Sequence, residues 1–264
     1  MKKIIYIISL FVSSVLYTSC DALDLTPEDY FGSGNYWNNE AQVDGYMTGM
    51  HSQLRSYYDM FYVLGEVRGG TQRVGTSSEN TSLNYANLRS NVIDQDRPGI
   101  SNWYGLYSPI MQVNHFIQQV ENECSFLDDT NRKHYLAQAY GLRALYYFML
   151  YKTYGGVPIV KVTADKFYVE RATAEATLEF IKGDIQKSEN NYADITVTNS
   201  YDKTIWSKAA TLMLKAEIYM WAAKVTITGH TATGTTDLKV AQAALNQIIG
   251  KFELLSDFEN VFST

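Results

Sequence analysis

The feature that most constrains the fold is the segment from Tyr135 to Val160, YLAQAYGLRALYYFMLYKTYGGVPIV. Apolar and aromatic residues recur on it at i, i+3, i+4 and i+7, which predicts a helix. One apolar face comprises Leu136, Ala139, Tyr140, Ala144, Tyr147, Leu150 and Tyr151, and a second comprises Leu142, Leu145, Phe148 and Met149. A helix that is apolar on two faces must be packed between neighbours. Its small residues should let another helix approach closely: Ala137, Ala139, Gly141 and Ala144.

The end of this helix is also encoded. Gly155 and Gly156 predict a left-handed cap, and Pro158 cannot continue a helix, so residues 157–162 should be extended. Inside the helix, Arg143 falls on the apolar face, where a charge must be paired or must extend along the apolar surface to reach solvent. We expect a salt bridge from Arg143 to an acidic residue of a neighbouring helix.

Apolar periodicity predicts six helices in all. They span Glu40–Tyr58, Ser101–Glu123, Asn131–Tyr154, Ala172–Tyr192, Ile205–Lys224 and Asp237–Ile249. The fold class is therefore mainly α. Antiparallel pairs with alanine at their crossing points are typical of TPR-like stacked helical pairs, here joined by long irregular loops, although the 34-residue TPR period is not clean.

The run LRALYYFMLYKTYGGVPIV resembles the LRA-x-YY-x-x-L-x-x-x-[FY]-GGVP segment of the SusD/RagB-like family. Members of that family are outer-membrane lipoproteins of Bacteroidetes-type bacteria that capture nutrients for a TonB-dependent transporter. A second specific resemblance is TIWSKAATLMLKAEIYMW at 204–221. Looser ones lie at 20–29, 36–41, 102–117, 172–192 and 250–262, so the resemblance runs in order along the chain.

The amino terminus predicts a lipoprotein signal peptide at residues 1–19. Lys2 and Lys3 precede an apolar stretch too short to span a membrane, and Leu-Tyr-Thr-Ser-Cys ending at Cys20 is similar to a lipobox. Tyr17 stands where the common pattern has Leu. Lipidation of Cys20 is the favoured interpretation, and an ordinary cysteine near a cleavage site is the alternative.

The charge balance limits the partners. Without Lys2 and Lys3, 20 of the 22 basic residues remain against 28 acidic ones, a formal charge of −8. Such a chain has no general attraction for nucleic acid or anionic lipid, so its membrane contact should be the lipid anchor. The acidic stretch after Cys20 resembles the family's leader, which implies localisation at the outer membrane, facing the exterior.

A long loop from 65 to 99 is rich in Gly, Ser, Asn and Thr and poor in apolar periodicity. In the family the corresponding loop helps to build the ligand face. Its aromatic, guanidinium and amide groups suit recognition of sugar hydroxyls. The candidate ligand-binding residues are Arg68, Arg73, Tyr85, Asn87, Arg89 and Arg97. An Ω-type surface loop without a ligand is the other interpretation.

Catalytic and metal sites are not predicted. The histidines are scattered: His51 should lie on a helix surface, and His230 has no companion ligand. No P-loop spacing is present, and the carboxylates lie on helix surfaces or in linkers, so a glycoside hydrolase is disfavoured and no cofactor is expected. Trp103 should serve packing, and Asn114 should form a hydrogen bond to the backbone of a neighbouring helix.

The resemblance implies a surface lipoprotein that binds a nutrient, most often an oligosaccharide, and delivers it to a SusC-type TonB-dependent transporter. The alternative is a TPR-like peptide- or protein-binding adapter. Family members are roughly twice as long, so residues 20–264 should form a SusD-like N-terminal helical domain without the usual C-terminal half. We expect that such a domain exposes an enlarged apolar patch.

Overall fold

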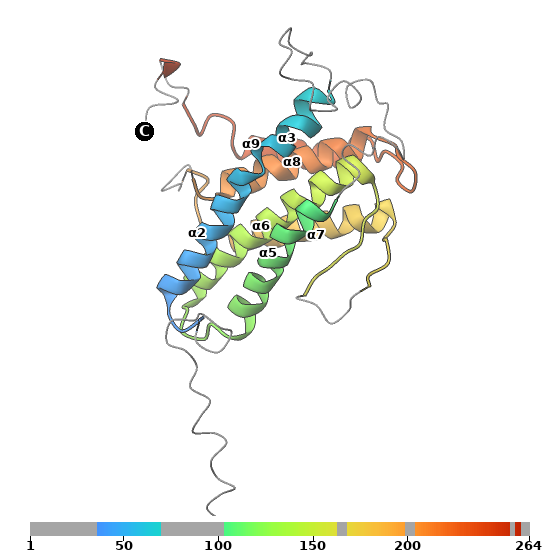
Figure 1. Ribbon diagram of the computed structural model, residues 1–264. Coiled ribbons are helices and arrows are strands. Elements are labelled where there is room, and N and C mark those ends of the chain that lie inside the picture. The colour runs from blue at the N-terminus through green and yellow to red at the C-terminus, as the bar shows by residue number, and fades with distance from the viewer. Residues whose placement is uncertain (1–35, 70–102, 163–167, 199–203, 254–256, 260–264) are drawn as a thin grey trace, which may run out of the picture. The chain divides into compact units, whose positions relative to one another are not determined.

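The computed structural model describes residues 36–69, 103–162, 168–198, 204–253 and 257–259 (Figure 1). The chain divides into two units, residues 1–38 and residues 39–264. Residues 36–38 are the described part of the first unit. The helices among the described residues all belong to the second unit.

The second unit is mainly α-helical, as the sequence predicts. Its elements are α2 (Glu40–Ser56), α3 (Tyr58–Tyr62), the π-helical η1 (Val63–Val67), α5 (Tyr104–Asn122), α6 (Asp129–Tyr154), α7 (Ala174–Asn191), α8 (Lys208–Lys224) and α9 (Thr235–Asn246). All six predicted helices are present, whereas α3 and η1 were not predicted. The described residues otherwise contain two isolated bridges, Pro158 with Arg171 and Ile227 with His230. None of the described helices combines the length and apolar content that a membrane span requires.

The helices begin where the sequence supplies a cap. The side chains of Asn39, Asp128, Thr173 and Ser207 each accept a hydrogen bond from the backbone N–H three residues later. These bonds satisfy donors that the first turn of a helix would otherwise leave unpaired. The observed starts of α6, α7 and α8 therefore lie within three residues of the predicted ones.

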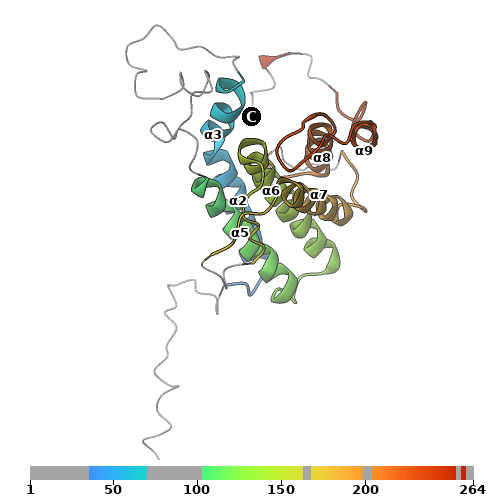
Figure 2. The same cartoon turned by 90° about the vertical axis from the view of Figure 1, so that its right-hand side faces the viewer.

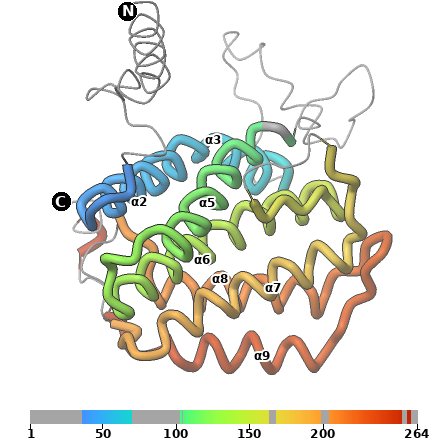
Figure 3. The backbone as a smooth tube through the Cα atoms, turned by 90° about the horizontal axis from the view of Figure 1, so that it is seen from below, coloured from blue at the N-terminus to red at the C-terminus, as the bar shows by residue number. Residues whose placement is uncertain are grey.

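The helices pack in chain order, from α2 against α5 to α8 against α9 (Figures 2 and 3). Neighbours such as α6 and α7 are antiparallel, because Arg143 contacts Asp184 while Ala137, nearer the start of α6, contacts Ser188, nearer the end of α7. The most extensive contacts join α6 to α7 and α8 to α9. This arrangement leaves the end of α6 beside the start of α7.

Helix α6 is the centre of this array. Sixteen of its 26 residues are buried, and they occupy every face of the helix from Tyr135 to Tyr151. It contacts α5, α7 and α8. The prediction that this helix is packed between neighbours is therefore confirmed.

The predicted pairing of Arg143 is also confirmed. Its Nε and Nη2 donate to the two carboxylate oxygens of Asp184 on α7, at 2.7 and 2.8 Å. Its Nη1 donates to Oδ1 of Asn114 on α5, at 2.8 Å. The side chains of Arg143 and Asp184 are 5% and 2% exposed, so both charges depend on this pairing.

Gly141 on α6 accommodates a side chain rather than a helix backbone. A Cβ atom there would lie 2.2 Å from Nε1 of Trp206. Trp206 precedes α8 and is held in place by its indole N–H, which donates to Thr211, and by its carbonyl, which accepts from Tyr192. Thr211 in turn contacts the hydroxyl of Ser188, which donates to Ala137 O.

The prediction that His51 lies on a helix surface is wrong. The side chain is buried, with Nδ1 2.9 Å from Met47 O and Nε2 accepting from the backbone N–H of Trp206 at 2.9 Å. Because a carbonyl can only accept, Nδ1 carries the proton and the ring is neutral. His51 thus joins α2 to the segment that leads into α8, which sequence spacing could not reveal.

This arrangement predicts a dependence of stability on pH. Burial is the main cause that lowers the pKa of His51, His115 and His134 below the ordinary value of 6.5. A lowered pKa in the folded state means that the unfolded chain takes up protons first as pH falls. These histidines therefore contribute fully to the free energy of unfolding above about pH 6.5, and their contribution decreases as pH falls below that value.

The measurement is the melting temperature by circular dichroism between about pH 7.5 and about pH 5.5, on either side of the ordinary histidine value. We expect it to fall with acidification, and His51→Gln should make the fall less steep. An unchanged melting temperature across this range would show that these histidines do not titrate differently in the two states.

Candidate functional site

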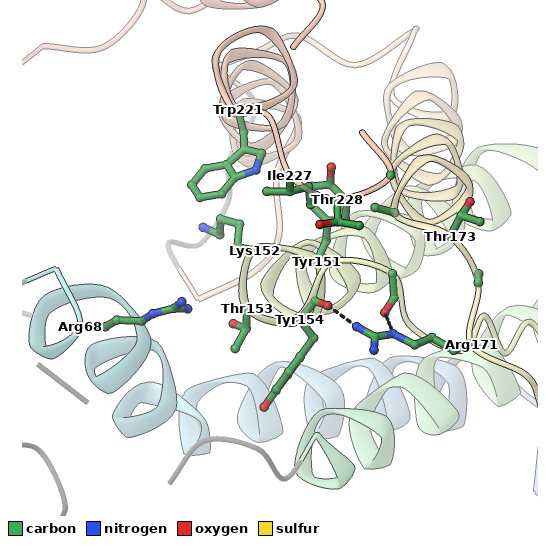
Figure 4. Close-up of a pocket in the computed structure, with 15 residues that line it drawn as sticks. Arg68, Tyr151, Lys152, Thr153, Tyr154, Arg171, Thr173, Trp221, Ile227 and Thr228 are labelled. Atoms are coloured by element: carbon green, nitrogen blue, oxygen red, sulfur yellow. Dashed lines mark hydrogen bonds between the residues drawn. The ribbon is translucent and has the colours of Figure 1, made fainter. Parts of the chain in front are cut away.

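A pocket of about 660 Å³ lies at the C-terminal end of α6 (Figure 4). Four segments build it: the residue after η1, the end of α6 with its glycine turn, the start of α7, and the end of α8 with the loop after it. The lining residues are Arg68, Tyr151, Lys152, Thr153, Tyr154, Gly155, Gly156, Arg171, Ala172, Thr173, Ala174, Trp221, Ile227, Thr228 and Gly229.

The glycine turn brings α6 and α7 together at this place. Gly155 has φ 72° and ψ −122°, so its φ is positive as predicted although its ψ lies outside the left-handed helical region. A Cβ on Gly156 would lie 2.1 Å from Ala172 O and 2.9 Å from Ala174 N. The backbone before α7 therefore packs directly on Gly156, and only glycine permits that approach.

The extended segment 157–162 is fixed by side chains from the array. The hydroxyl of Tyr107 donates to Pro158 O at 2.6 Å, and that of Tyr147 accepts from Val160 N at 2.8 Å. Asn114 Nδ2 donates to Val160 O at 2.9 Å. Asn114 thus forms the predicted backbone hydrogen bond, but its acceptor belongs to the extended segment and not to a neighbouring helix. These contacts fix the turn that forms one wall of the pocket.

The loop between α8 and α9 forms another wall. Ile227 and His230 form a tight antiparallel bridge, and Gly229 O accepts from Glu175 N at the start of α7. His230 is buried, with Nδ1 3.1 Å from Glu175 Oε2 and Nε2 3.2 Å from Ala222 O. His230 therefore fixes this loop against α7 and α8.

Two lining side chains carry polar atoms that lack a partner. The Tyr151 hydroxyl and the Trp221 indole Nε1 are buried and form no hydrogen bond within the described part of the chain. Burial and the nearby Glu175 raise the pKa of Tyr151 to about 12, so its hydroxyl keeps its proton at neutral pH. Both groups can donate a hydrogen bond, and leaving such donors unpaired is costly.

Three cationic side chains line the pocket. Lys152 lies 2.7 Å from Glu217 and packs over the Phe148 ring. Arg171 donates to Gly156 O and Tyr154 O, each at 2.5 Å. The guanidinium of Arg68 has no hydrogen-bond or ion-pair partner in the described ranges, and Figure 4 shows it pointing inward from the side opposite Arg171.

An aromatic cluster supports this rim. Trp103 and Tyr154 meet edge to face at 5.8 Å between ring centroids, and the Arg171 guanidinium lies 5.8 Å from the Trp103 ring. Burial raises the pKa of Tyr154, and Arg68 opposes that shift. The packing role predicted for Trp103 agrees with these contacts.

Of the predicted ligand residues, Arg68 is the one inside the described ranges, and it lines this pocket. Arg73, Tyr85, Asn87, Arg89, Arg97 and the proposed lipidation site Cys20 lie outside the described residues. Sequence reasoning did not assign Tyr151, Arg171 or Trp221 to a site. The feature that these three residues share in the sequence is their position, since each lies near a turn at which a helix ends or begins.

Among the residues that the structure describes, the pocket lining includes no Asp, Glu or His. A paired-carboxylate mechanism of glycoside hydrolysis therefore has no candidate residues in this described lining. Within the described residues, no group of three or more His, Cys, Asp and Glu side chains could hold a metal ion. The pocket offers hydrogen-bond donors, aromatic surface and positive charge, which are the means of binding.

Comparison with known proteins identifies relatives over most of the chain. Residues 23–220 match the model of a SusD-like family described as starch-binding and associating with the outer membrane. A curated SusD-like protein of Formosa agariphila is 27% identical over 227 residues, which cover 83% of this chain and 42% of that protein.

Solved structures share the fold. A SusD superfamily protein of Bacteroides fragilis superimposes with a TM-score of 0.75 at 34% identity, covering 86% of this chain and 46% of that one. NanU of Bacteroides fragilis gives a TM-score of 0.75 at 31% identity, covering 90% and 47%. The chain thus spans less than half the length of each of these relatives.

Proposed function

Because the chain belongs to the SusD-like family, we propose that it binds an extracellular nutrient at the outer membrane, and that this nutrient is an oligosaccharide. In this proposal Cys20 carries the lipid anchor, the protein faces the exterior, and the ligand passes to a SusC-type TonB-dependent transporter. The observation that carries the binding role is the pocket at the end of α6, whose buried donors have no partner within the described residues.

The pocket has the chemistry that sugar recognition requires. The Trp221 indole and the Tyr154 ring supply apolar faces, while Tyr151, Thr228 and the cationic groups supply hydrogen-bond donors. A saccharide presents both apolar C–H faces and many hydroxyl oxygens, so it can satisfy both kinds of group. The volume of about 660 Å³ is in the range of small-molecule sites.

The test is a binding screen of the purified chain against neutral and acidic oligosaccharides and against unstructured peptides, followed by titration calorimetry. We expect saccharide binding that Trp221→Phe weakens about tenfold, because that change removes one uncharged donor from a buried contact. The control is Tyr58→Phe, which removes a hydroxyl from an exposed side chain outside the pocket lining. Binding of peptides alone would instead support a TPR-like adapter.

Lipidation is tested separately. Cys20→Ala should move the protein from the membrane fraction to the soluble periplasmic fraction, because Cys20 would be the acylation site and the anchor would be the membrane contact. The measurement is fractionation followed by blotting. Membrane association equal to that of the wild type would contradict this prediction.

The division into a signal peptide at 1–19 and a helical domain at 20–264 stays a prediction, as does the enlarged apolar patch. The described surface does expose several apolar side chains on or near α8 and α9, namely Met213, Met220, Ile249 and Phe252. Binding of a hydrophobic dye to the purified chain would measure whether they form one patch.

A further inference from the structure

The pocket at the end of α6 has a charge opposite to that of the chain. Its described lining residues include Arg68, Lys152 and Arg171 and no carboxylate, whereas the whole chain has a formal charge of −6. A neutral sugar needs only hydrogen-bond donors and acceptors. Three cations around one small pocket therefore indicate a ligand group that is itself charged.

The described residues neutralise only part of this charge. Lys152 is paired with Glu217, whose carboxylate lies 2.7 Å away. Arg171 is held by the neutral carbonyls of Gly156 and Tyr154, and Arg68 has no side-chain partner in the described ranges. Two guanidinium charges thus remain without a carboxylate counterpart among the described residues. Because a guanidinium matches the planar geometry of a carboxylate, a carboxylate on the ligand could supply that counterpart.

The ends of two helices meet here and act in opposite directions. The 18-residue helix α7 begins in the pocket lining at Thr173 and Ala174, and a helix N-terminus favours an anion, but Glu175 already places a carboxylate in its first turn and Glu175 N already donates to Gly229 O. The C-terminus of α6 disfavours one, but its carbonyls at Tyr151 and Tyr154 already accept from Gly155 N and Arg171. The helix ends therefore do not cancel the effect of the arginines.

The unpartnered donors give an independent reason for a ligand. The Tyr151 side chain is 1% exposed, and its hydroxyl, like Nε1 of Trp221, lacks a hydrogen-bond partner in the part of the chain that the structure describes. These donors can satisfy oxygen atoms of a ligand whose charged group lies against the arginines. The site thus provides neutral donors and cations in one pocket.

We propose that this pocket binds an acidic saccharide through a carboxylate, as carried by a uronic acid residue. The assignment rests on the proposed function and adds the ligand class and the residues that select it. Arg68 binds the carboxylate, Arg171 on the opposite side of the pocket adds positive charge, and Tyr151 and Trp221 donate to hydroxyl or ring oxygens.

The experiment compares galacturonic acid oligomers with neutral galactose oligomers of the same length, by titration calorimetry on the purified chain at low and high salt. We expect the acidic oligomer to bind about tenfold more tightly at low salt, and this preference to shrink at high salt. Arg68→Gln should weaken binding of the acidic oligomer about tenfold and leave the neutral one within about twofold. The control Lys239→Gln removes the same charge from the exposed face of α9 and should change neither.

The outcomes separate the two proposals. Equal binding of both oligomers, or an equal loss for both with Arg68→Gln, overturns the acidic ligand and leaves oligosaccharide binding in place. Binding of the acidic oligomer that Arg68→Gln does not weaken overturns the assignment to this pocket. Absence of binding to either oligomer, with binding to peptides, overturns the proposed function as well.

Discussion

Replacing Asp184 with asparagine should lower the free energy of unfolding by about 3–5 kcal/mol, because it leaves the charge of Arg143 buried without its counterion. Asp184 accepts two hydrogen bonds from Arg143, and both side chains are almost fully buried. Burial by itself would lower the pKa of Arg143, but the hydrogen bonds and the negative charge of Asp184 raise it. The pair therefore persists because each charge compensates the other.

Urea unfolding followed by circular dichroism would measure this effect. The double variant Arg143→Met, Asp184→Leu should recover much of the loss, because apolar residues of similar size can replace a buried ion pair. Recovery should be incomplete, since Oδ1 of Asn114 loses its donor and a buried acceptor without a partner costs about 1–3 kcal/mol.

The matched control is Asp194→Asn, which breaks an ion pair between Asp194 and Lys133 at 3.6 Å. Both side chains are largely exposed, so the expected change is within about 1 kcal/mol. A loss for Asp184→Asn no larger than that of this control would show that the buried pair does not hold α6 and α7 together.

Gly156→Ala should have the second large effect, a loss of about 2–4 kcal/mol of unfolding free energy together with weakened ligand binding. The added methyl group would lie 2.1 Å from Ala172 O and 2.8 Å from the carbonyl carbon of Thr173, which are backbone atoms. Backbone cannot move aside as a flexible side chain can, so the start of α7 must separate from the turn. Because that contact forms a wall of the pocket, stability and binding should fall together.

Gly183→Ala provides the control for this prediction. Gly183 lies within α7, and a Cβ there meets nothing within 4 Å. Alanine should therefore stabilise the helix by about 0.5–1 kcal/mol, since it restricts the unfolded chain more than glycine does. Denaturation and saccharide titration on both variants measure the two effects. A Gly156→Ala variant with wild-type stability and binding would show that this close approach is not needed.

The helices and the central position of α6 could be predicted from local residue patterns. Apolar periodicity found all six longer helices, because burying one or two faces of a helix imposes a 3.6-residue repeat on the chain. The capping side chains at Asp128, Thr173 and Ser207 act within one turn, so their effect is local. The pairing of Arg143 could also be predicted, because a charge on an apolar face must find a counterion wherever the fold supplies one.

Which distant residues meet depends instead on how the helices pack. His51 and Trp206 are 155 positions apart, and their hydrogen bond exists because α2 packs near the segment before α8. The pocket likewise combines Arg68, Tyr151, Arg171 and Trp221 from four segments. No repeating pattern in the sequence predicts these contacts, because each depends on how the ends of antiparallel helices align. The hydroxyl of Tyr151 and the indole N–H of Trp221 have no hydrogen-bond partner among the described residues, which becomes visible only once the surrounding atoms are placed.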